Sequence, residues 1–194
     1  MGRPDLTEQR TAEILDAFEQ CVARFGLEGS SLERIAEEAG MKRSILRHYV
    51  GNRDDLILAL AERVVRKYRA HLDVFANSIS PEKRINQLVE LLLPTRSEAT
   101  SDSILVIESL IAAAEQHEEV REQMLSYMDD VVEMVASQLR LEFPKQSKGE
   151  CWSVAYGVVC IWFNQESLSP LRLQAKYLRA ARATMRSLIE TLRS

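Results

Sequence analysis

From Lys42 to Arg53 the sequence carries four basic side chains and no acidic one, in a chain whose net charge is −4. The preceding residues 1–40 hold four basic and nine acidic side chains, so the positive segment follows an acidic one. Arginine and lysine donate to phosphate oxygens and to base edges, which makes a concentrated positive segment a candidate for nucleic-acid binding. A solvated helix face gives the same charge pattern. Charge alone therefore leaves both interpretations open.

The residues around this segment meet the packing requirements of a helix-turn-helix. Two short helices are predicted, over about residues 31–39 and 42–49, and they must cross at a steep angle. The crossing requires a small side chain, which Ala36 provides, and the turn requires a left-handed residue, which Gly40 provides. The predicted shared core consists of Ile35, Ala39, Met41, Ile45 and Leu46. The alternative is an ordinary helical hairpin with a basic exposed edge.

Residues from Thr7 to about Leu60 resemble the TetR family of regulators. The matching features are Ile35-Ala36, Ala39-Gly40, the His48-Tyr49 pair and the basic Arg53 that opens the next helix. The resemblance implies that the histidine and the tyrosine help to hold phosphates and that the fourth helix starts at the DNA backbone. The predicted DNA-binding residues are Ser31, Lys42, Arg43, Ser44, Arg47, His48, Tyr49 and Arg53.

The sequence also departs from the usual TetR pattern within the second of these helices. Ser44-Ile45 stand where family members commonly carry Gly-Thr or Pro-Thr, and Arg47 and Val50 stand where aromatic residues are usual. Arg47 adds a contact to a base or a phosphate and so alters sequence preference. The operator sequence is therefore not predicted.

Apolar periodicity predicts an all-α fold of about nine helices, with no strand. The predicted helices cover about residues 7–25, 31–39, 42–49, 53–77, 81–93, 102–116, 118–140, 147–164 and 170–192. We expect a three-helix DNA-binding head over residues 1–52 and a ligand-binding and dimerisation body over residues 53–194, linked by the helix at 53–77. The helix at 147–164 is apolar on nearly every side, which predicts that it is buried all round.

The resemblance further implies a homodimer formed through the last two helices, which binds a pseudo-palindromic double-stranded operator. It also implies regulation of transcription, most often repression, in response to a small molecule bound in the body. Apolar and aromatic residues there suggest a mostly hydrophobic effector. The candidate ligand-binding residues are Ile104, Ile107, Ile111, Met124, Tyr127, Met128, Trp152, Tyr156 and Trp162. Side chains of these types at helical spacing also occur as simple core.

Other classes of protein find little support in the sequence. No apolar run reaches the roughly 20 residues of a membrane helix, no export signal is evident, and three cysteines without CxxC spacing suggest reduced cytoplasmic thiols. We expect no enzyme, no metal and no cofactor, and we interpret Glu115, His117, Glu118 and Glu119 as solvated helix-end charges. The alternative function is an all-helical ligand-sequestering or interaction protein without specific DNA binding.

Overall fold

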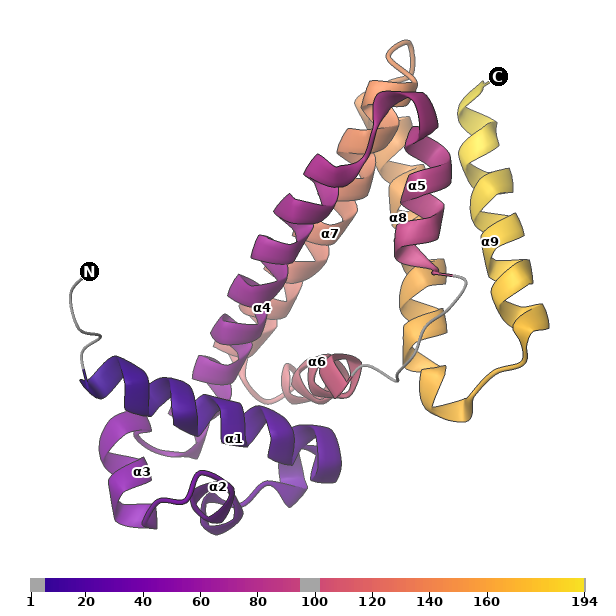
Figure 1. Ribbon diagram of the computed structural model, residues 1–194. Coiled ribbons are helices and arrows are strands. Elements are labelled where there is room, and N and C mark those ends of the chain that lie inside the picture. Colours follow the sequence, from indigo (N-terminus) through magenta and orange to yellow (C-terminus); the bar gives the residue numbers. More distant parts are fainter. Residues whose placement is uncertain (1–5, 95–101, 194) are drawn as a thin grey trace. The chain divides into compact units, whose positions relative to one another are not determined.

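The computed structural model describes residues 6–94 and 102–193, and within these ranges it contains helices and no strand (Figure 1). The α-helices are α1 (Leu6–Gly29), α2 (Leu32–Glu38), α3 (Arg43–Val50), α4 (Arg53–Ser78), α5 (Arg84–Leu92), α6 (Asp102–Ala113), α7 (Glu118–Glu142), α8 (Lys148–Ser167) and α9 (Ala175–Glu190). Short 3-10 helices cover Pro81–Lys83, Ser169–Leu171 and Thr191–Arg193. The prediction of an all-α fold with about nine helices is confirmed. None of the described helices is long and apolar enough to cross a membrane.

Side-chain packing divides the chain into two compact units. Among the described residues, the first unit joins 6–66 to 102–125, and the second joins 67–94 to 126–193. The boundaries therefore fall inside α4 and inside α7. The predicted division at residue 52 concerns which residues meet DNA, and it remains a prediction.

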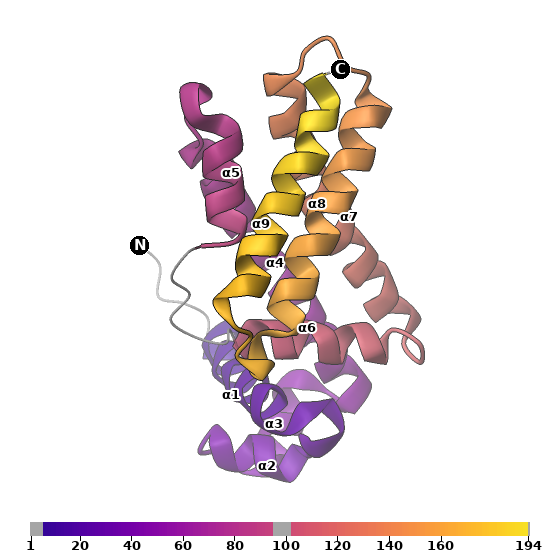
Figure 2. The same ribbon diagram turned by 90° about the vertical axis from the view of Figure 1, so that its right-hand side faces the viewer.

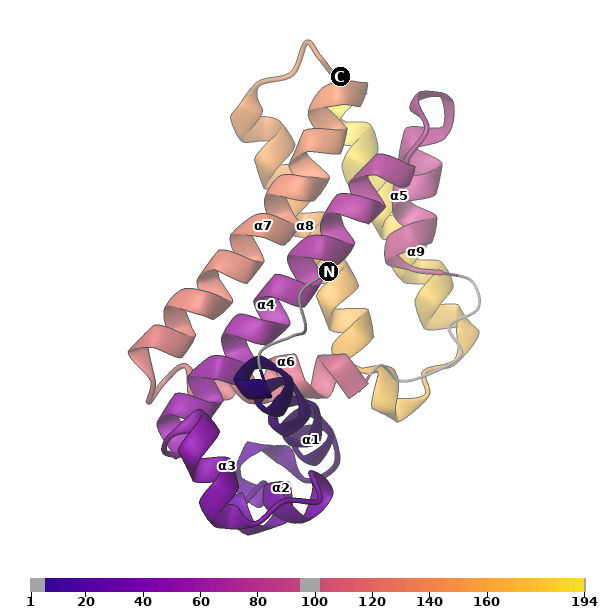
Figure 3. The same cartoon turned by 60° about the vertical axis from the view of Figure 1, so that its left-hand side comes forward.

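The first unit is built on α1, which packs against α2, α3 and α6 (Figures 1 and 3). The buried core of this unit includes Ile14, Phe18, Cys21, Val22, Ile35, Leu46, Leu56 and Leu60. Gly26 has a φ of 69° and interrupts the helical backbone of α1, a left-handed conformation that glycine adopts without strain. Arg63 on α4 is ion-paired with Asp16 and Glu19 of α1, so polar contacts reinforce the apolar packing.

In the second unit, α9 packs against both α8 and α5 (Figure 2). The buried face of α9 carries Ala181, Met185 and Ile189 at four-residue spacing. Polar contacts join α4 to α7 as well, since Arg69 donates to the Asp130 carboxylate and to the Ser126 hydroxyl, each at 2.6 Å. The core of this unit thus lies between helices that are far apart in the sequence.

The prediction that the helix at 147–164 is buried all round is wrong for the single chain. One face of α8 is buried through Cys151, Val154, Ala155, Val158 and Val159. The opposite face exposes Trp152, Tyr156 and Cys160, which recur every four residues and so share one side of the helix. One copy of the chain therefore covers only one side of this apolar helix.

Candidate nucleic-acid interface

The turn between α2 and α3 has the backbone geometry that its sequence requires. Ser31 begins α2, and its hydroxyl accepts a hydrogen bond from the Arg34 backbone N–H at 3.2 Å. Gly40 has a φ of 62°, and the Met41 N–H reaches back to the Ala36 carbonyl oxygen at 2.8 Å. A side chain at position 40 would be strained by this left-handed backbone, which explains the glycine.

Packing beneath this turn fixes how α3 is presented. Ile35, Ala36, Leu46 and Val50 are buried, so both helices are held by a shared apolar core. Ile45, which the sequence pattern places inward, is 42% exposed instead. The inward positions of α3 are Leu46 and Val50, four residues apart, and Ile45 lies about 100° around the helix from Leu46. An exposed apolar side chain can contact a thymine methyl group, so Ile45 joins the candidate interface.

The predicted DNA-binding residues of α3 share its exposed side. Lys42, Arg43, Ser44, Arg47 and His48 are all exposed, and Tyr49 is half-buried. The rings of His48 and Tyr49 meet edge to face, with their centroids 5.2 Å apart. Three formal positive charges and three hydrogen-bonding side chains thus lie along one short helix and its N-cap residue. Such a surface suits phosphates and base edges.

Arg43 is engaged within the free protein. Its guanidinium forms an ion pair with Glu33 of α2, and both side chains are more than half exposed. Glu37 is a further exposed acid of the same helix. A phosphate that binds Arg43 must therefore compete with a carboxylate of the same head.

Arg53 has a structural role that the sequence reasoning missed. Its guanidinium donates to the Ser30 carbonyl oxygen at 2.7 Å and also to the Leu27 carbonyl oxygen, which ties the connection between α1 and α2 to the first residue of α4. Both terminal nitrogens of the guanidinium are thereby used inside the protein. A direct DNA contact by Arg53 remains a prediction.

The start of α4 is capped by side chains on both sides. The Asn52 side-chain oxygen accepts from the Asp54 N–H at 2.7 Å and from the Asp55 N–H at 3.1 Å. The Asp55 carboxylate in turn accepts from the Asn52 N–H at 2.8 Å. Such reciprocal capping fixes where α4 begins.

The candidate ligand-binding residues differ in their exposure. Ile104, Ile107, Met124 and Tyr127 are buried, whereas Met128 and Trp162 are half-buried. The exposed members of the set are Ile111, Trp152 and Tyr156. Trp152 and Tyr156 stack on the outer face of α8, with ring planes 1° apart and centroids 5.7 Å apart. In the single chain these two rings line a surface and not an interior site.

The set is also divided between the two packing units. Ile104, Ile107, Ile111 and Met124 belong to the first unit, and Tyr127, Met128, Trp152, Tyr156 and Trp162 belong to the second. The prediction that all nine bind one ligand is untested. Periodicity identified these side chains as apolar helix positions but carried no information about which of them converge.

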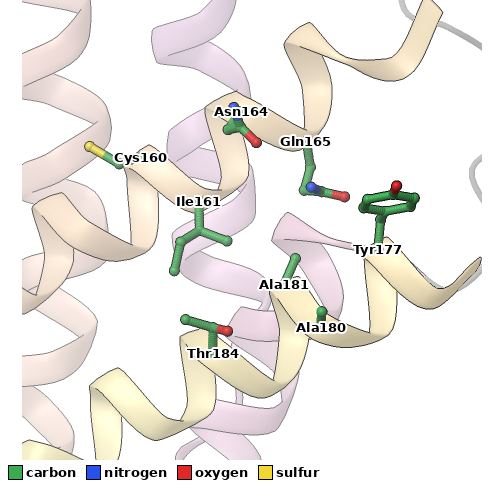
Figure 4. Close-up of a pocket in the computed structure, with 8 residues that line it drawn as sticks. All are labelled: Cys160, Ile161, Asn164, Gln165, Tyr177, Ala180, Ala181 and Thr184. Carbon is green, nitrogen blue, oxygen red and sulfur yellow. The ribbon is translucent and has the colours of Figure 1, made fainter. Parts of the chain in front are cut away.

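A groove of about 370 Å³ runs between α8 and α9 (Figure 4). Cys160 and Ile161 line it from α8, and Tyr177, Ala180 and Thr184 line it from α9. The side chains on the α9 wall are mostly small. Small side chains allow another helix to approach closely, so this groove and the exposed rings of α8 form a continuous candidate for a protein interface.

None of the three cysteines forms a disulfide. Cys21 and Cys151 are buried, and burial raises the pKa of both thiols, whereas Cys160 is exposed in the groove. Within the described residues no group of three or more His, Cys, Asp or Glu side chains is arranged to hold a metal ion.

Residues 14–60, which include α2, α3 and the start of α4, match the family described as bacterial regulatory proteins, tetR family. This part of the chain is therefore similar to the TetR-family head. This match contains Ile35, Ala36, Gly40 and the exposed basic side chains of α3. The resemblance inferred from those residues is therefore confirmed.

Two curated relatives match different lengths of the chain. The protein is 29% identical over 92 residues to the HTH-type transcriptional regulator PksA of Bacillus subtilis (strain 168), covering 47% of this chain and 45% of PksA. It is 38% identical over 63 residues to the HTH-type transcriptional repressor AcnR of Corynebacterium jeikeium (strain K411), covering 32% of this chain and 33% of AcnR. The chain thus spans less than half the length of these two curated relatives.

A TetR transcription regulator from Haloarcula marismortui ATCC 43049 has a similar solved structure. The TM-score is 0.77 at 18% identity, over 95% of this chain and 98% of the other. At this identity the likeness establishes the fold, and it covers the body as well as the head.

Proposed function

We propose that the protein is a ligand-responsive, DNA-binding transcriptional repressor that acts in the cytoplasm. The observation that carries the proposal is the exposed basic side of α3, held by the helix-turn-helix packing of a TetR-family head. The relatives PksA and AcnR are named as a transcriptional regulator and a transcriptional repressor. No catalytic activity forms part of this proposal.

The operator is a pseudo-palindromic duplex and the protein binds it as a homodimer. One head offers few cationic contacts, so two heads are needed for useful affinity. The exposed Trp152–Tyr156 stack and the α8–α9 groove support dimerisation through the last two helices, because covering them removes apolar surface from water. A two-fold axis would place the two α3 helices about 34–36 Å apart, or a multiple of that, which fits successive major grooves.

A small, mostly hydrophobic effector releases the operator. It must bind the DNA-free arrangement of the two heads more tightly than the DNA-bound one, since equal affinity for both shifts nothing. The buried candidates Ile104, Ile107 and Met124 of the first unit, and Tyr127 of the second, each lie in the apolar core of their own unit.

Selection of genomic fragments by the purified protein, followed by sequencing, tests the proposal. We expect one short two-fold symmetric sequence to be enriched, with an affinity that falls steeply as salt is raised. Arg43→Ala combined with Arg47→Ala should abolish the enrichment. Lys145→Ala combined with Lys148→Ala removes the same charge from exposed positions near the start of α8 and should leave it unchanged.

Two results would count against the proposal. If no fragment were enriched above background, the chain would be an all-helical binding protein without specific DNA recognition. If the two double variants lowered binding equally, the contact surface would not be α3.

A further inference from the structure

Ile45 is an apolar side chain on the otherwise polar outer surface of α3. Of the eight residues of this helix, all of which the structure describes, it is the large apolar one that is exposed, at 42%. The buried side chains are Leu46 and Val50, and α3 packs against α1 and α2 (Figure 3). An α-helix advances about 100° per residue, which turns Ile45 away from Leu46 and toward the exposed surface. DNA that binds α3 therefore lies against Ile45.

Exposed polar residues border Ile45 on this outer surface. His48 follows it by three residues and Ser44 precedes His48 by four, so the three side chains are neighbours on one side of the helix. Lys42 and Arg43 add positive charge at the start of α3. Such charge attracts the phosphate backbones, and a helix that lies between them presents its outermost side chains to the base edges. Ile45 is the third residue of α3, and the first residues of a recognition helix are those that meet bases.

The chemistry of isoleucine limits which feature of a base it can recognise. Its side chain has no hydrogen-bond donor or acceptor, unlike the threonine that TetR-family members commonly carry at this position. In the major groove the base edges present nitrogen and oxygen atoms, and the thymine C5-methyl group is the apolar exception. Covering an edge that carries only polar groups would leave a donor or acceptor without a partner. Isoleucine therefore favours thymine over the other three bases.

We propose that Ile45 determines operator sequence by packing against the methyl group of one thymine in each half-site. The inference rests on the proposed function, because it specifies a base pair within the operator of that function. Isoleucine suits such a contact, since β-branching leaves it one strongly preferred rotamer in a helix and little side-chain freedom is lost on binding. A two-fold symmetric dimer repeats the contact, so two thymines are read in each operator.

Replacing thymidine with deoxyuridine removes this methyl group and leaves the Watson–Crick pairing unchanged. In the operator found by fragment selection, each thymidine is replaced in turn, together with its symmetry mate in the other half-site. Fluorescence anisotropy of the labelled duplex measures the affinity of the wild-type protein. Burying one methyl group is worth about fourfold in affinity, so we expect one such symmetric replacement to weaken binding by about ten- to twentyfold.

Ile45→Ala assigns this loss to the named side chain. Wild type and Ile45→Ala are compared on the thymidine and the deoxyuridine duplexes, which forms a double-mutant cycle between protein and DNA. The replacement that weakens the wild type should change the affinity of Ile45→Ala by less than about twofold, because the shortened side chain no longer reaches the methyl group. Leu125→Ala, which truncates an exposed apolar side chain of α7 in the same unit, should keep the full loss.

Two results would overturn the inference. Either every deoxyuridine replacement leaves the affinity of the wild type within about twofold, or Ile45→Ala retains the whole loss. The wild-type comparison changes only the DNA, so misfolding of a variant cannot account for its result. If no fragment is bound specifically, the proposed function fails and this inference fails with it. If a fragment is bound and no methyl effect depends on Ile45, the repressor function stands and the inference alone fails.

Discussion

Replacing Glu33 with glutamine should tighten DNA binding, although Glu33 carries the wrong charge to contact DNA itself. In the free protein Glu33 is ion-paired with Arg43, one of the exposed arginines of α3. Arg43 must give up this contact when it binds a phosphate or a base. Glu33→Gln removes the competitor and also removes a negative charge that repels the DNA backbone.

The size of the effect follows from the exposure of the pair. The side chains of Arg43 and Glu33 are 56% and 61% exposed, and exposed ion pairs stabilise by about 0.2–1 kcal/mol. A dimer has two heads, so the competition amounts to about 0.4–2 kcal/mol per operator complex. We expect the affinity of Glu33→Gln to rise by about two- to thirtyfold at low salt. Salt should reduce the gain, because the pair is open to solvent.

Fluorescence anisotropy with a labelled operator duplex measures this affinity over a range of salt concentrations. Glu37→Gln is the matched control, since it removes an equal charge from another exposed position of α2. If the two variants gained equally, general charge would explain the result and the Arg43 pair would have no specific role. A weaker complex with Glu33→Gln would refute the reasoning outright.

Arg53→Ala should lower the free energy of unfolding by about 1–3 kcal/mol, because two carbonyl groups lose a charged donor. Urea denaturation measures this change. Weaker DNA binding at unchanged stability would instead indicate that Arg53 contacts DNA. Thr184→Arg places a large charged side chain in the α8–α9 groove and should therefore prevent dimerisation. Light scattering should then detect monomers, and Cys160 in the groove should become reactive toward maleimide. Ala70→Arg, at an exposed site of α4, should cause neither change. Because burial raises the pKa of Glu166 from 4.5, its contribution to stability is greatest below that pH and is lost as pH rises through the folded-state value. The thermal stability of Glu166→Gln relative to wild type should therefore increase from acid to neutral pH. A pH-independent difference would contradict the raised pKa of Glu166.

The sequence predicted the head well because its local geometry depends on few residues. The left-handed backbone at position 40 favours glycine, and the close helix crossing at position 36 requires a small side chain. Both requirements can be recognised from the sequence without knowing which other residues pack there. Ile45 was misplaced because α3 has only eight residues, so one residue of uncertainty in phase moves a side chain from the core to the surface. The internal role of Arg53 could not be predicted, because the Leu27 and Ser30 carbonyls to which it donates lie more than twenty residues earlier in the chain.

The body was less predictable for a different reason. Apolar composition alone could not show that α8 has one bare face, because the same residues suit a core or an interface between copies. Trp152 and Tyr156 illustrate this, since they are candidates for a ligand site and also stack on the surface of the single chain. Glu166 has no distinctive sequence context. Its partial burial, which raises the pKa of its carboxyl, is revealed only by the fold.

The arginines that join α4 to the head also determine how the head can respond to a force. Arg53 binds the end of α1, and Arg63 contacts α1 through Asp16, Glu19 and the Ala12 carbonyl oxygen. The two arginines that make these contacts are separated by about 15 Å along α4. Because α1 and α4 are joined at two points, neither helix can easily tilt or rotate relative to the other. The two helices should therefore move as one rigid body over this stretch of α4. Any swing of the recognition helix must then originate beyond Arg63, and a flexible substitution placed there should uncouple effector from operator while leaving the affinity for each intact.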